Sequence, residues 1–583
     1  MGTQETAAVQ ALKKMFKDGS RPQAIQKCED LHRQDPGNRE VQRLCATMHL
    51  VEGNFARAGE LLKAVRGSGA SDADVLFNIG FCERQAGNFA GADQWFGLYA
   101  TEHPRDPEGW ASRAECKFQL GEFAPGLEMA DRAIALDRAC LPAWTVRGHC
   151  QAALGELDSA LASYKAADAI QPAGETAYQA GMVLMRLNKP AEAVECFGRA
   201  ISLAPEFAKA RAARADVRQG LGHLQEAAAD YEAAVKLAPG DGESLKKATL
   251  CLLELGRGDE ALRLCEEVLN ALPDNLTARL GAEWVRSQLV PLWHVPMMNE
   301  PERNQAYFDG LQAVVAPDRL VFEIGTGSGL LAMMAAKLGA RRVVTCEAVS
   351  LVARTASKIV ERNGYREQVR VVAKPSHAVQ LGEDLPEQAD VLVHEIFSSE
   401  LLGEHVLPAI EDAKRRLLKP GGVVMPGAAS IMVALVGGDE LAQNIHASES
   451  FGFDVREFNA IYPKKRPLYR EDLRPVLMSE PVEAFRFDFN ADSDFPAESR
   501  RLELTATQAG RCYGVIQWIR LDMAPGVCFE NAPAGRRAVA SWQQTTYGFD
   551  EPLDITPGKV VPVRALHDRA RPWFALDAAE AGR

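Results

Sequence analysis

The sequence lacks the features that mark several classes of protein. Its 583 residues contain no run of eighteen apolar residues, which a membrane-spanning helix would need. The first residues, MGTQETAAVQALKKMF, lack the apolar stretch of a secretion signal. Basic residues are fewer than acidic ones, 66 against 79, and the formal net charge of −13 argues against a general nucleic-acid binder. We therefore expect a cytoplasmic protein that binds neither a membrane nor nucleic acid.

Metal-binding and disulfide patterns are also missing. The twelve cysteines include no Cys-x-x-Cys pair and no His/Cys cluster of zinc spacing, and several fall at apolar positions of helical patterns. We expect reduced thiols in hydrophobic cores and no metal site. With 47% hydrophobic and 25% charged residues, the chain has a globular composition and is long enough for two to four domains.

The first half of the chain carries a repeat of about 34 residues. Prolines mark its period at Pro36, Pro104, Pro172, Pro205, Pro239 and Pro273. Twelve positions before each proline stands a small residue, at Ala24, Ala92, Ala160, Ala193, Ala227 and Ala261. This is the tetratricopeptide pattern, in which small residues let two antiparallel helices approach and proline closes the unit. We predict an all-α solenoid of about eight repeats over residues 5–275.

The repeats themselves indicate no chemistry, because every repeating residue is a packing residue. We expect the array to bind a protein partner or substrate, and a dimerising or spacing role is the alternative. Pro291 and Pro296 interrupt helix continuity after the array. We place a linker at residues 276–292.

An apolar strand, a glycine turn and a helix follow one another in LVFEIGTGSGLLAMMAAKLGA. A second strand ends at Glu347, and strands continue to alternate with helices, which predicts a parallel sheet with ligands at the carboxyl ends of its strands. Gly325, Gly327 and Gly329 would let the backbone approach a ligand, and Glu347 is placed to accept both hydroxyls of a ribose. Residues 293–426 are therefore predicted to form a Rossmann-like α/β domain.

Two classes of cofactor use a glycine turn with a downstream acid. A dinucleotide fingerprint would have its third glycine at the position of Leu330. Glu323, two residues before the first glycine, is instead typical of S-adenosylmethionine sites. The turn favours S-adenosylmethionine, and on this motif alone a dinucleotide remains the alternative.

Two glutamates nine residues apart, Glu395 and Glu404, follow the fourth predicted strand, QADVLVHEIF. Two carboxylates brought to one point can hold a planar cation on two edges. Next to a cofactor site of the predicted kind, they indicate an enzyme that alkylates a guanidinium.

These motifs resemble those of the protein arginine N-methyltransferase family, most closely its seventh and ninth members. The likeness rests on MMNEPERNQAY, VFEIGTGSGLLAMMAAKLGA, SKIVERNG and EIFSSELLGEHVLP, and an N-terminal tetratricopeptide array is a trait of the ninth member. The likeness implies an S-adenosylmethionine-dependent enzyme that methylates protein arginines, with a monomethyl or symmetric dimethyl product and no metal. The sequence does not distinguish the two products.

The resemblance also assigns roles to individual residues. Glu395 and Glu404 would hold the substrate guanidinium. Cofactor contacts would come from Arg303, Glu323, Gly325, Gly327, Gly329 and Glu347. Substrate contacts would come from Met297, Met298, Trp542 and Gln543. Glu400, His377 and Ser541 receive no role, and Ser541 stands where many members have histidine.

Short β-type runs after Pro426 resemble the family's β-barrel, which we place at residues 427–583 with a dimerisation arm near 451–475. Members seven and nine carry two methyltransferase-like cores, whereas one is visible here, so we expect a homodimer. Two other functions stay open: a repeat scaffold whose inactive methyltransferase fold senses the cofactor, and a methyltransferase that acts on a small molecule.

Overall fold

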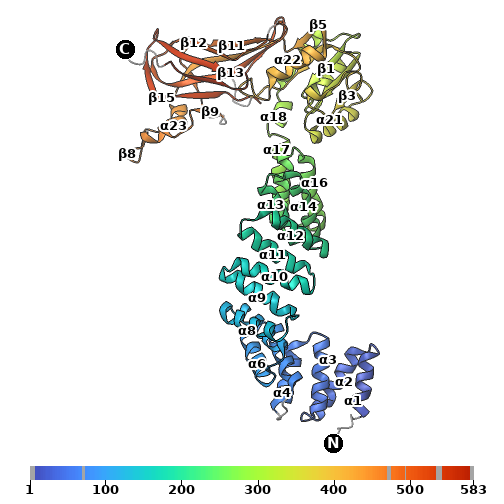
Figure 1. The fold of residues 1–583 in the computed structure, drawn as a ribbon. Coiled ribbons are helices and arrows are strands. Elements are labelled where there is room, and N and C mark those ends of the chain that lie inside the picture. Colours follow the sequence, from blue (N-terminus) through green and yellow to red (C-terminus); the bar gives the residue numbers. More distant parts are fainter. Residues whose placement is uncertain (1–6, 68–71, 469–473, 493, 534–540, 578–583) are drawn as a thin grey trace. The chain divides into compact units, whose positions relative to one another are not determined.

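A computed structural model describes residues 7–67, 72–468, 474–492, 494–533 and 541–577 (Figure 1). The chain divides into two units, Met1–Ala282 and Glu283–Arg583. In their described parts no helix has both the length and the apolar character needed to cross a membrane.

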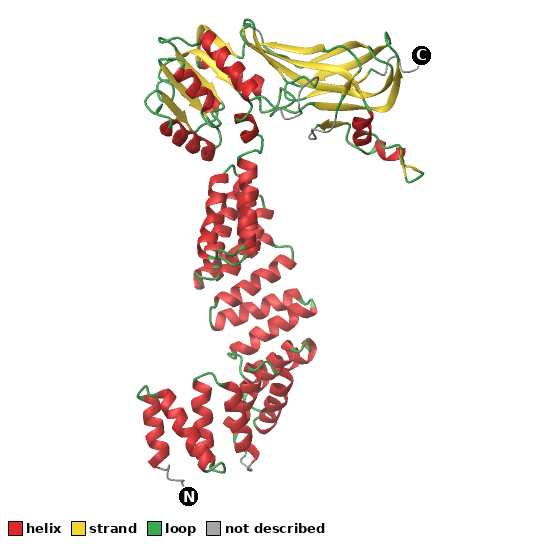
Figure 2. Cartoon of the chain, turned by 180° about the vertical axis from the view of Figure 1, so that it is seen from behind, coloured by secondary structure: helices red, strands yellow, loops and turns green. Residues whose placement is uncertain are grey.

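The described part of the first unit consists of helices (Figure 2). The helices of the array are α1 (Ala7–Lys17), α2 (Arg21–Gln34), α3 (Arg39–Val51), α4 (Phe55–Gly67), α5 (Ala73–Gln85), α6 (Phe89–Glu102), α7 (Pro107–Gln119), α8 (Phe123–Leu136), α9 (Leu141–Leu154), α10 (Leu157–Ile170), α11 (Gly174–Arg186), α12 (Pro190–Leu203), α13 (Ala208–Gly220), α14 (Leu224–Leu237), α15 (Gly242–Glu254) and α16 (Gly258–Ala271). Consecutive helices pack against one another in pairs. The predicted tetratricopeptide array is confirmed. Helix α17 (Leu276–Leu289) follows and fills most of the segment predicted as a linker.

Small residues and a recurring hydrogen bond hold the repeats together. The alanines twelve positions before the repeat prolines are fully buried: Ala24, Ala92, Ala160, Ala193, Ala227 and Ala261. Six positions after several of these prolines, a side chain donates to the proline carbonyl. Trp110 donates to Pro104 at 3.1 Å, and Arg211 donates to Pro205 at 3.0 Å. One position of the repeat therefore sets the packing of its helices, and another stabilises the turn between repeats.

Gly181 in α11 provides a test of this packing. A Cβ at this position would lie 2.6 Å from the ring of Phe197, which is fully buried. We expect Gly181→Ala to lower the free energy of unfolding by about 1–3 kcal/mol, because the fully buried ring would have to shift to accept the added methyl group. The control is Gly220→Ala at the end of α13, where a Cβ would meet nothing within 4 Å. Urea denaturation should show destabilisation for the first variant only, and equal stability of the two would contradict the packing argument.

The expectation that all cysteines are reduced is wrong for one pair. Cys28 in α2 and Cys45 in α3 form a disulfide with a Cα–Cα distance of 5.6 Å. Both side chains are buried where two successive helices face each other. Because this proximity comes from helix packing, no spacing motif in the sequence indicates it.

The second unit begins within α17 and continues with α18 (His294–Met298) and α19 (Pro301–Val314), followed by a five-stranded parallel sheet. Its strands are β1 (Leu320–Ile324), β2 (Arg342–Cys346), β3 (Val369–Val372), β4 (Ala389–His394) and β5 (Leu418–Met425). They lie in the order β3-β2-β1-β4-β5. Helices α20 (Leu330–Lys337), α21 (Ser350–Arg362) and α22 (Val406–Arg416) alternate with them. The predicted α/β methyltransferase fold is confirmed, and the order places β2, β1 and β4 side by side.

The remainder of the second unit is mostly antiparallel β structure. One sheet contains β6 (Ala428–Gly437), β9 (Lys465–Pro467), β10 (Val476–Leu477), β11 (Val482–Asp488), β13 (Gly510–Ala524), β14 (Val527–Glu530) and β15 (Thr545–Ile555). A second contains β12 (Glu498–Thr505), β16 (Val560–His567) and β17 (Pro572–Leu576). No pairing between described strands closes these two sheets into one ring. A C-terminal β region is therefore established, and barrel closure stays a prediction.

The predicted dimerisation arm lies between β6 and β10. It includes the hairpin of β7 (Glu449–Ser450) and β8 (Phe453–Asp454), which follows the short helix α23 (Asp439–Ile445), while residues 469–473 lie outside the described residues. The apolar side chains of Phe451, Phe453 and Ile461 are largely exposed. Its role stays a prediction.

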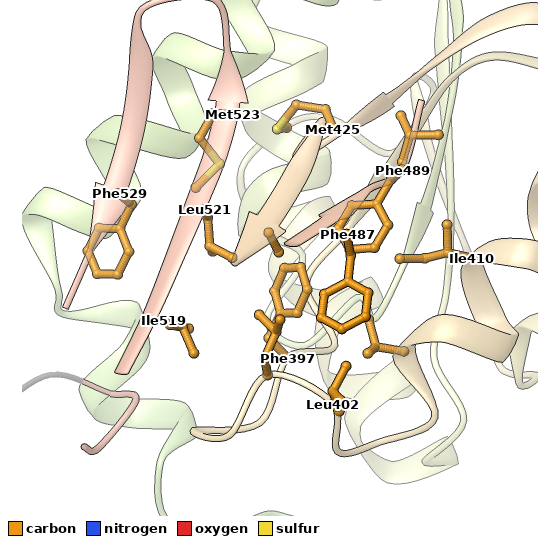
Figure 3. Close-up of a cluster of buried hydrophobic side chains, with 14 of the residues drawn as sticks. Phe397, Leu402, Ile410, Met425, Phe487, Phe489, Ile519, Leu521, Met523 and Phe529 are labelled. Carbon is orange, nitrogen blue, oxygen red and sulfur yellow. The ribbon is translucent and has the colours of Figure 1, made fainter. Parts of the chain in front are cut away.

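One hydrophobic cluster joins the parallel sheet to the antiparallel region (Figure 3). Phe397 and Leu402, from the loop after β4, are buried in this cluster together with Phe487 and Phe489 at the end of β11. The rings of Phe397 and Phe489 lie 6.2 Å apart. The loop that carries the two predicted catalytic glutamates is thus anchored in the core by its own apolar residues.

Candidate functional site

A cavity of about 460 Å³ lies at the carboxyl ends of β1, β2 and β4. Of the predicted residues, its lining includes Met297, Gly325, Gly327, Glu347, Glu395 and Glu404. The fold thus brings residues from four separate segments to one place. Six other predicted residues do not line it: Met298, Arg303, Glu323, Gly329, Trp542 and Gln543.

The glycine turn has the backbone geometry that only glycine adopts readily. Gly325, Gly327 and Gly329 all have positive φ, between 51° and 88°. A Cβ on Gly325 would lie 2.9 Å from the carbonyl oxygen of Glu395, whereas one on Gly327 would meet nothing within 4 Å. Gly325 therefore allows close packing of two loops, and Gly327 leaves open space at the cavity wall. Gly329 begins α20, and a Cβ there would approach Val360.

Glu347 follows β2 and faces the glycine turn. Its carboxylate accepts hydrogen bonds from the backbone N–H groups of Gly327, at 3.1 Å, and Val349, at 3.0 Å. These bonds orient the carboxylate at the cavity wall, where a ligand with two hydroxyl groups can reach it.

Glu323 lies in β1 beneath the glycine turn and is 1% exposed. Neither of its carboxylate oxygens has a hydrogen-bond partner among the described residues. Burial raises the pKa of Glu323 to about 8. A buried carboxyl without a partner is costly, so this residue is a candidate for an interaction with a cationic ligand group.

The loop after β4 has an unusual backbone. Leu401, Glu404 and His405 all have positive φ, at 74°, 56° and 57°. Side chains other than glycine rarely adopt this conformation, which costs about 1–3 kcal/mol per residue and often occurs at functional sites. The Oγ of Ser398 accepts from the backbone N–H groups of Glu400 and Gly403 and holds the loop closed. With this backbone conformation the Glu404 side chain lies in the cavity wall.

Both loop glutamates hold their protons more tightly than exposed glutamates do. Burial raises the pKa of Glu395 to about 7; the nearby Glu404 adds to this rise and Arg303 opposes it. Burial also raises the pKa of Glu404, with a contribution from Glu347, while His294 opposes it. Glu395 therefore ionises near neutral pH, and Glu404 ionises above the usual range of a glutamate.

Arg303 lies behind Glu395. The two side chains are 3% and 7% exposed, and the guanidinium Nη2 is 3.2 Å from a Glu395 carboxylate oxygen. The guanidinium also lies over the rings of Tyr307, at 4.8 Å, and Trp542, at 5.2 Å. Arg303 is therefore at the site, in contact with a glutamate predicted to bind substrate.

The two candidate methionines lie in different environments. Helix α18 places Met297 in the cavity wall with 8% exposure, whereas Met298 is 37% exposed and away from the cavity. Of the two, Met297 alone is placed to contact a molecule in the cavity.

Trp542 and Gln543 support the glutamate loop from behind. The indole N–H of Trp542 donates to the Phe397 carbonyl at 2.9 Å, and the backbone N–H of Gln543 donates to Ser399 Oγ at 3.0 Å. Trp542 is 3% exposed. These contacts position the loop, and neither residue lines the cavity.

Ser541 and Glu400 each have a specific partner. Both the backbone N–H and the hydroxyl of Ser541 donate to Glu300, at the start of α19. Glu400 forms an ion pair with Lys465 of β9. These two contacts connect the antiparallel region to the start of α19 and to the loop after β4.

Two histidines that were not predicted as site residues, His294 and His405, also line the cavity. His405 directly follows Glu404 in the sequence, and His294 stacks on Trp293 with ring centroids 4.1 Å apart. His294 lies in the WHVPMM segment, three residues before Met297. Its closeness in sequence to the predicted substrate methionines could have indicated that it belongs to the site. His377 also lines the cavity, from a 3₁₀ turn after β3. Among the described residues no group of three or more His, Cys, Asp or Glu side chains is arranged to hold a metal ion.

Comparison with family models separates the two units. Tetratricopeptide models match residues 46–107, 113–175, 178–242 and 219–282. A model described as ribosomal protein L11 methyltransferase (PrmA) matches residues 305–436. The second match coincides with the parallel sheet and the start of the antiparallel region.

Relatives were found in several organisms. An arginine N(omega)-methyltransferase from Streptomyces achromogenes subsp. streptozoticus is 34% identical over 351 residues, which cover 59% of this chain and 96% of the relative. Protein arginine N-methyltransferase 7 from Danio rerio is 28% identical over 316 residues, and that from Drosophila melanogaster is 30% identical over 329 residues. The matches cover 49% of this chain, and this chain spans about half of those two relatives, 46% and 47%.

Two solved structures have a weak likeness to this chain. A Trypanosoma brucei PRMT1 enzyme–prozyme complex with AdoHcy is 21% identical, with a TM-score of 0.44, 50% of this chain covered and 96% of that chain. Arabidopsis thaliana protein arginine methyltransferase 10 is 20% identical, with a TM-score of 0.39, 49% of this chain covered and 99% of that chain. Likenesses of this strength add nothing to the sequence matches.

Proposed function

Since this chain belongs to the arginine N-methyltransferase family, we propose that it transfers methyl groups from S-adenosylmethionine to guanidinium nitrogens of protein arginines. The observation that carries the proposal is the convergence of Glu395 and Glu404 with Glu347 and the glycine turn on one cavity. A pair of carboxylates matches a guanidinium, and an acid beside a glycine turn matches a ribose.

The residues that line the cavity, with Glu323 and Arg303 buried next to them, fit this donor. Glu347 and the open space at Gly327 suit an adenosine, with His377 at the same wall. The buried, unpartnered carboxyl of Glu323 and the guanidinium of Arg303 suit the ammonium and carboxylate of an amino acid. When bound, S-adenosylmethionine supplies an electrophilic methyl group on a sulfonium.

The two glutamates would orient and activate the acceptor. A free arginine side chain is protonated at physiological pH and is a poor nucleophile. Glu395 and Glu404 would draw its positive charge towards their side and aim one nitrogen at the methyl group, and this positioning contributes much of the rate. The raised pKa of Glu395 suits it to accept the proton that the nitrogen loses on transfer.

The number of methyl groups depends on the space beside the acceptor nitrogen. Met297 lies in the cavity wall and is our candidate for limiting that space. We propose monomethylarginine or symmetric dimethylarginine as the product. The roles of Met298, Trp542 and Gln543 in direct substrate contact remain predictions that their positions outside the cavity do not favour.

A second acceptor is favoured by one specific observation. The Streptomyces relative is named for arginine without mention of protein, and the match covers nearly all of it. Free arginine is therefore the alternative substrate. The tetratricopeptide array favours a protein substrate, because such repeats commonly present a surface to a partner protein.

One labelling experiment tests the proposal. The full chain is incubated with methyl-labelled S-adenosylmethionine and cell lysate, and labelled protein and small molecules are separated and hydrolysed. Methylarginine in the protein fraction is the expected result, and its identity gives the product type. Label in free arginine would favour the second candidate, and absence of label would favour a scaffold that only senses the cofactor.

We also propose a homodimer assembled through the arm, with the array recruiting substrate and the enzyme acting in the cytoplasm. Exposed Phe451, Phe453 and Ile461 support the arm's role, since apolar side chains gathered on one projection favour association. Ile461→Asp should convert the dimer to a monomer in sedimentation at micromolar concentration. A wild-type monomer with full activity would contradict the proposal.

A further inference from the structure

Arg303 has an incomplete set of partners in a buried position. Its Nη1 donates to Asn304 at 2.9 Å, and its Nη2 contacts Glu395 at 3.2 Å. Its Nε is buried with no hydrogen-bond partner among the described residues. A buried, charged donor without an acceptor is costly. The guanidinium would therefore gain from an additional anionic acceptor, and a carboxylate can accept two of its N–H groups at once.

The contact with Glu395 opposes substrate binding. Glu395 lines the cavity, and Arg303 lies behind it. The cation of Arg303 offsets part of the negative charge that an arriving substrate guanidinium would meet. It also occupies one of the two carboxylate oxygens. A substrate arginine must therefore share the Glu395 carboxylate with the guanidinium of Arg303.

A ligand carboxylate that pairs with Arg303 would reduce this competition. Such a carboxylate must draw the guanidinium partly or wholly away from Glu395, because Arg303 does not reach the cavity wall in its present position. The rings of Tyr307 and Trp542, over which the guanidinium lies, would restrict this movement. Glu395 would then present more charge and both oxygens to the cavity.

We propose that Arg303 couples the two binding events: a donor carboxylate on Arg303 strengthens the hold of Glu395 on the substrate guanidinium. This inference rests on the proposed function of the site. Two ligands are coupled when the binding of one changes the binding free energy of the other. The Arg303–Glu395 contact provides this change, because the donor carboxylate and the substrate guanidinium each compete with it. By the same linkage, bound substrate strengthens donor binding equally.

The test uses two probes that differ in the amino-acid part. S-Adenosylhomocysteine carries the carboxylate and no sulfonium charge, whereas methylthioadenosine fills the adenosine part and lacks the carboxylate. Calorimetry measures the affinity of the full chain for an arginine-containing peptide alone and with each probe at saturation. We expect S-adenosylhomocysteine to tighten peptide binding by about tenfold and methylthioadenosine to leave it nearly unchanged.

Variants of Arg303 identify the source of the coupling. Arg303→Gln should bind the peptide more tightly than the wild type when no probe is present, and S-adenosylhomocysteine at saturation should then add little. Arg303→Lys keeps the charge and should retain part of the coupling, which separates this role from support of the fold.

Equal tightening by both probes, or full coupling in Arg303→Gln, would overturn the inference. If the peptide bound in no condition and no methyl group were transferred, the proposed function would fall together with it. Peptide binding that ignores the probes while methyl transfer continues would overturn the coupling alone.

Discussion

Glutamine in place of Glu395 or Glu404 is expected to lower the rate of methyl transfer by about 10²–10³-fold or more while product cofactor still binds. Glutamine keeps the size of the side chain but removes the negative charge that orients the guanidinium. Glu404→Gln is the cleaner variant, because the buried Arg303 pairs with Glu395 and keeps that partner when Glu404 is replaced. Glu395→Gln also leaves the buried Arg303 without its ionic partner, so its thermal stability must be measured in parallel.

Glu400→Gln is the matched control for these variants. Glu400 lies on the same loop, pairs with Lys465, and does not line the cavity. Its replacement should change the rate only a few-fold. Single-turnover rates and the affinity for S-adenosylhomocysteine would be measured for all three variants. Retained turnover in both Glu395→Gln and Glu404→Gln would refute the roles given to the two carboxylates.

The value of kcat/KM is expected to fall steeply as pH is lowered below about 7. Burial raises the pKa of Glu395 to about 7 and that of Glu404 above its usual range. A protonated glutamate no longer attracts a guanidinium. Well below the pKa of such a glutamate in the free enzyme, kcat/KM therefore falls tenfold for each pH unit. For the Glu395 pKa of about 7 we expect a decrease of about fivefold between pH 7 and pH 6, a steeper fall at lower pH, and a plateau above pH 8.

Stability should change in the opposite direction over this range, which separates titration from unfolding. Because the folded-state pKa of Glu395 lies above its ordinary value of 4.5, the folded chain binds more protons than the unfolded chain between about pH 4.5 and 7. The stabilisation from Glu395 is therefore complete at low pH and lost as pH rises through about 7. A kcat/KM that is flat from pH 6 to 8, or one that falls together with the melting temperature, would contradict this account.

Local patterns predicted the framework of the site because its parts are determined by short-range rules. The glycines after β1 must adopt positive φ, and the alternation of apolar strands with helices sets a parallel sheet. These two features place Glu347 and Glu395 at the carboxyl ends of β2 and β4, the two strands that flank β1, and the sequence predicted that these ends face the ligand site. The same reasoning from proline and alanine spacing predicted the helical array.

Other parts of the site depend on contacts between distant segments. The ion pair of Arg303 with Glu395, and the hydrogen bond from Trp542 to Phe397, join elements far apart in the sequence. The positive φ of Glu404 has no local signal either, since glycine does not occupy the position. The disulfide between Cys28 and Cys45 escaped prediction for the same reason. Tertiary packing determines these features, so no local sequence pattern indicates them.

The most direct test of the central claim is a crystal structure of the full chain with S-adenosylhomocysteine and an arginine-containing peptide. The account predicts that the peptide guanidinium lies between Glu395 and Glu404, with N–O distances of about 2.7–2.9 Å to each and one nitrogen directed at the thioether sulfur. A guanidinium bound elsewhere, or the two carboxylates turned away from each other, would contradict it.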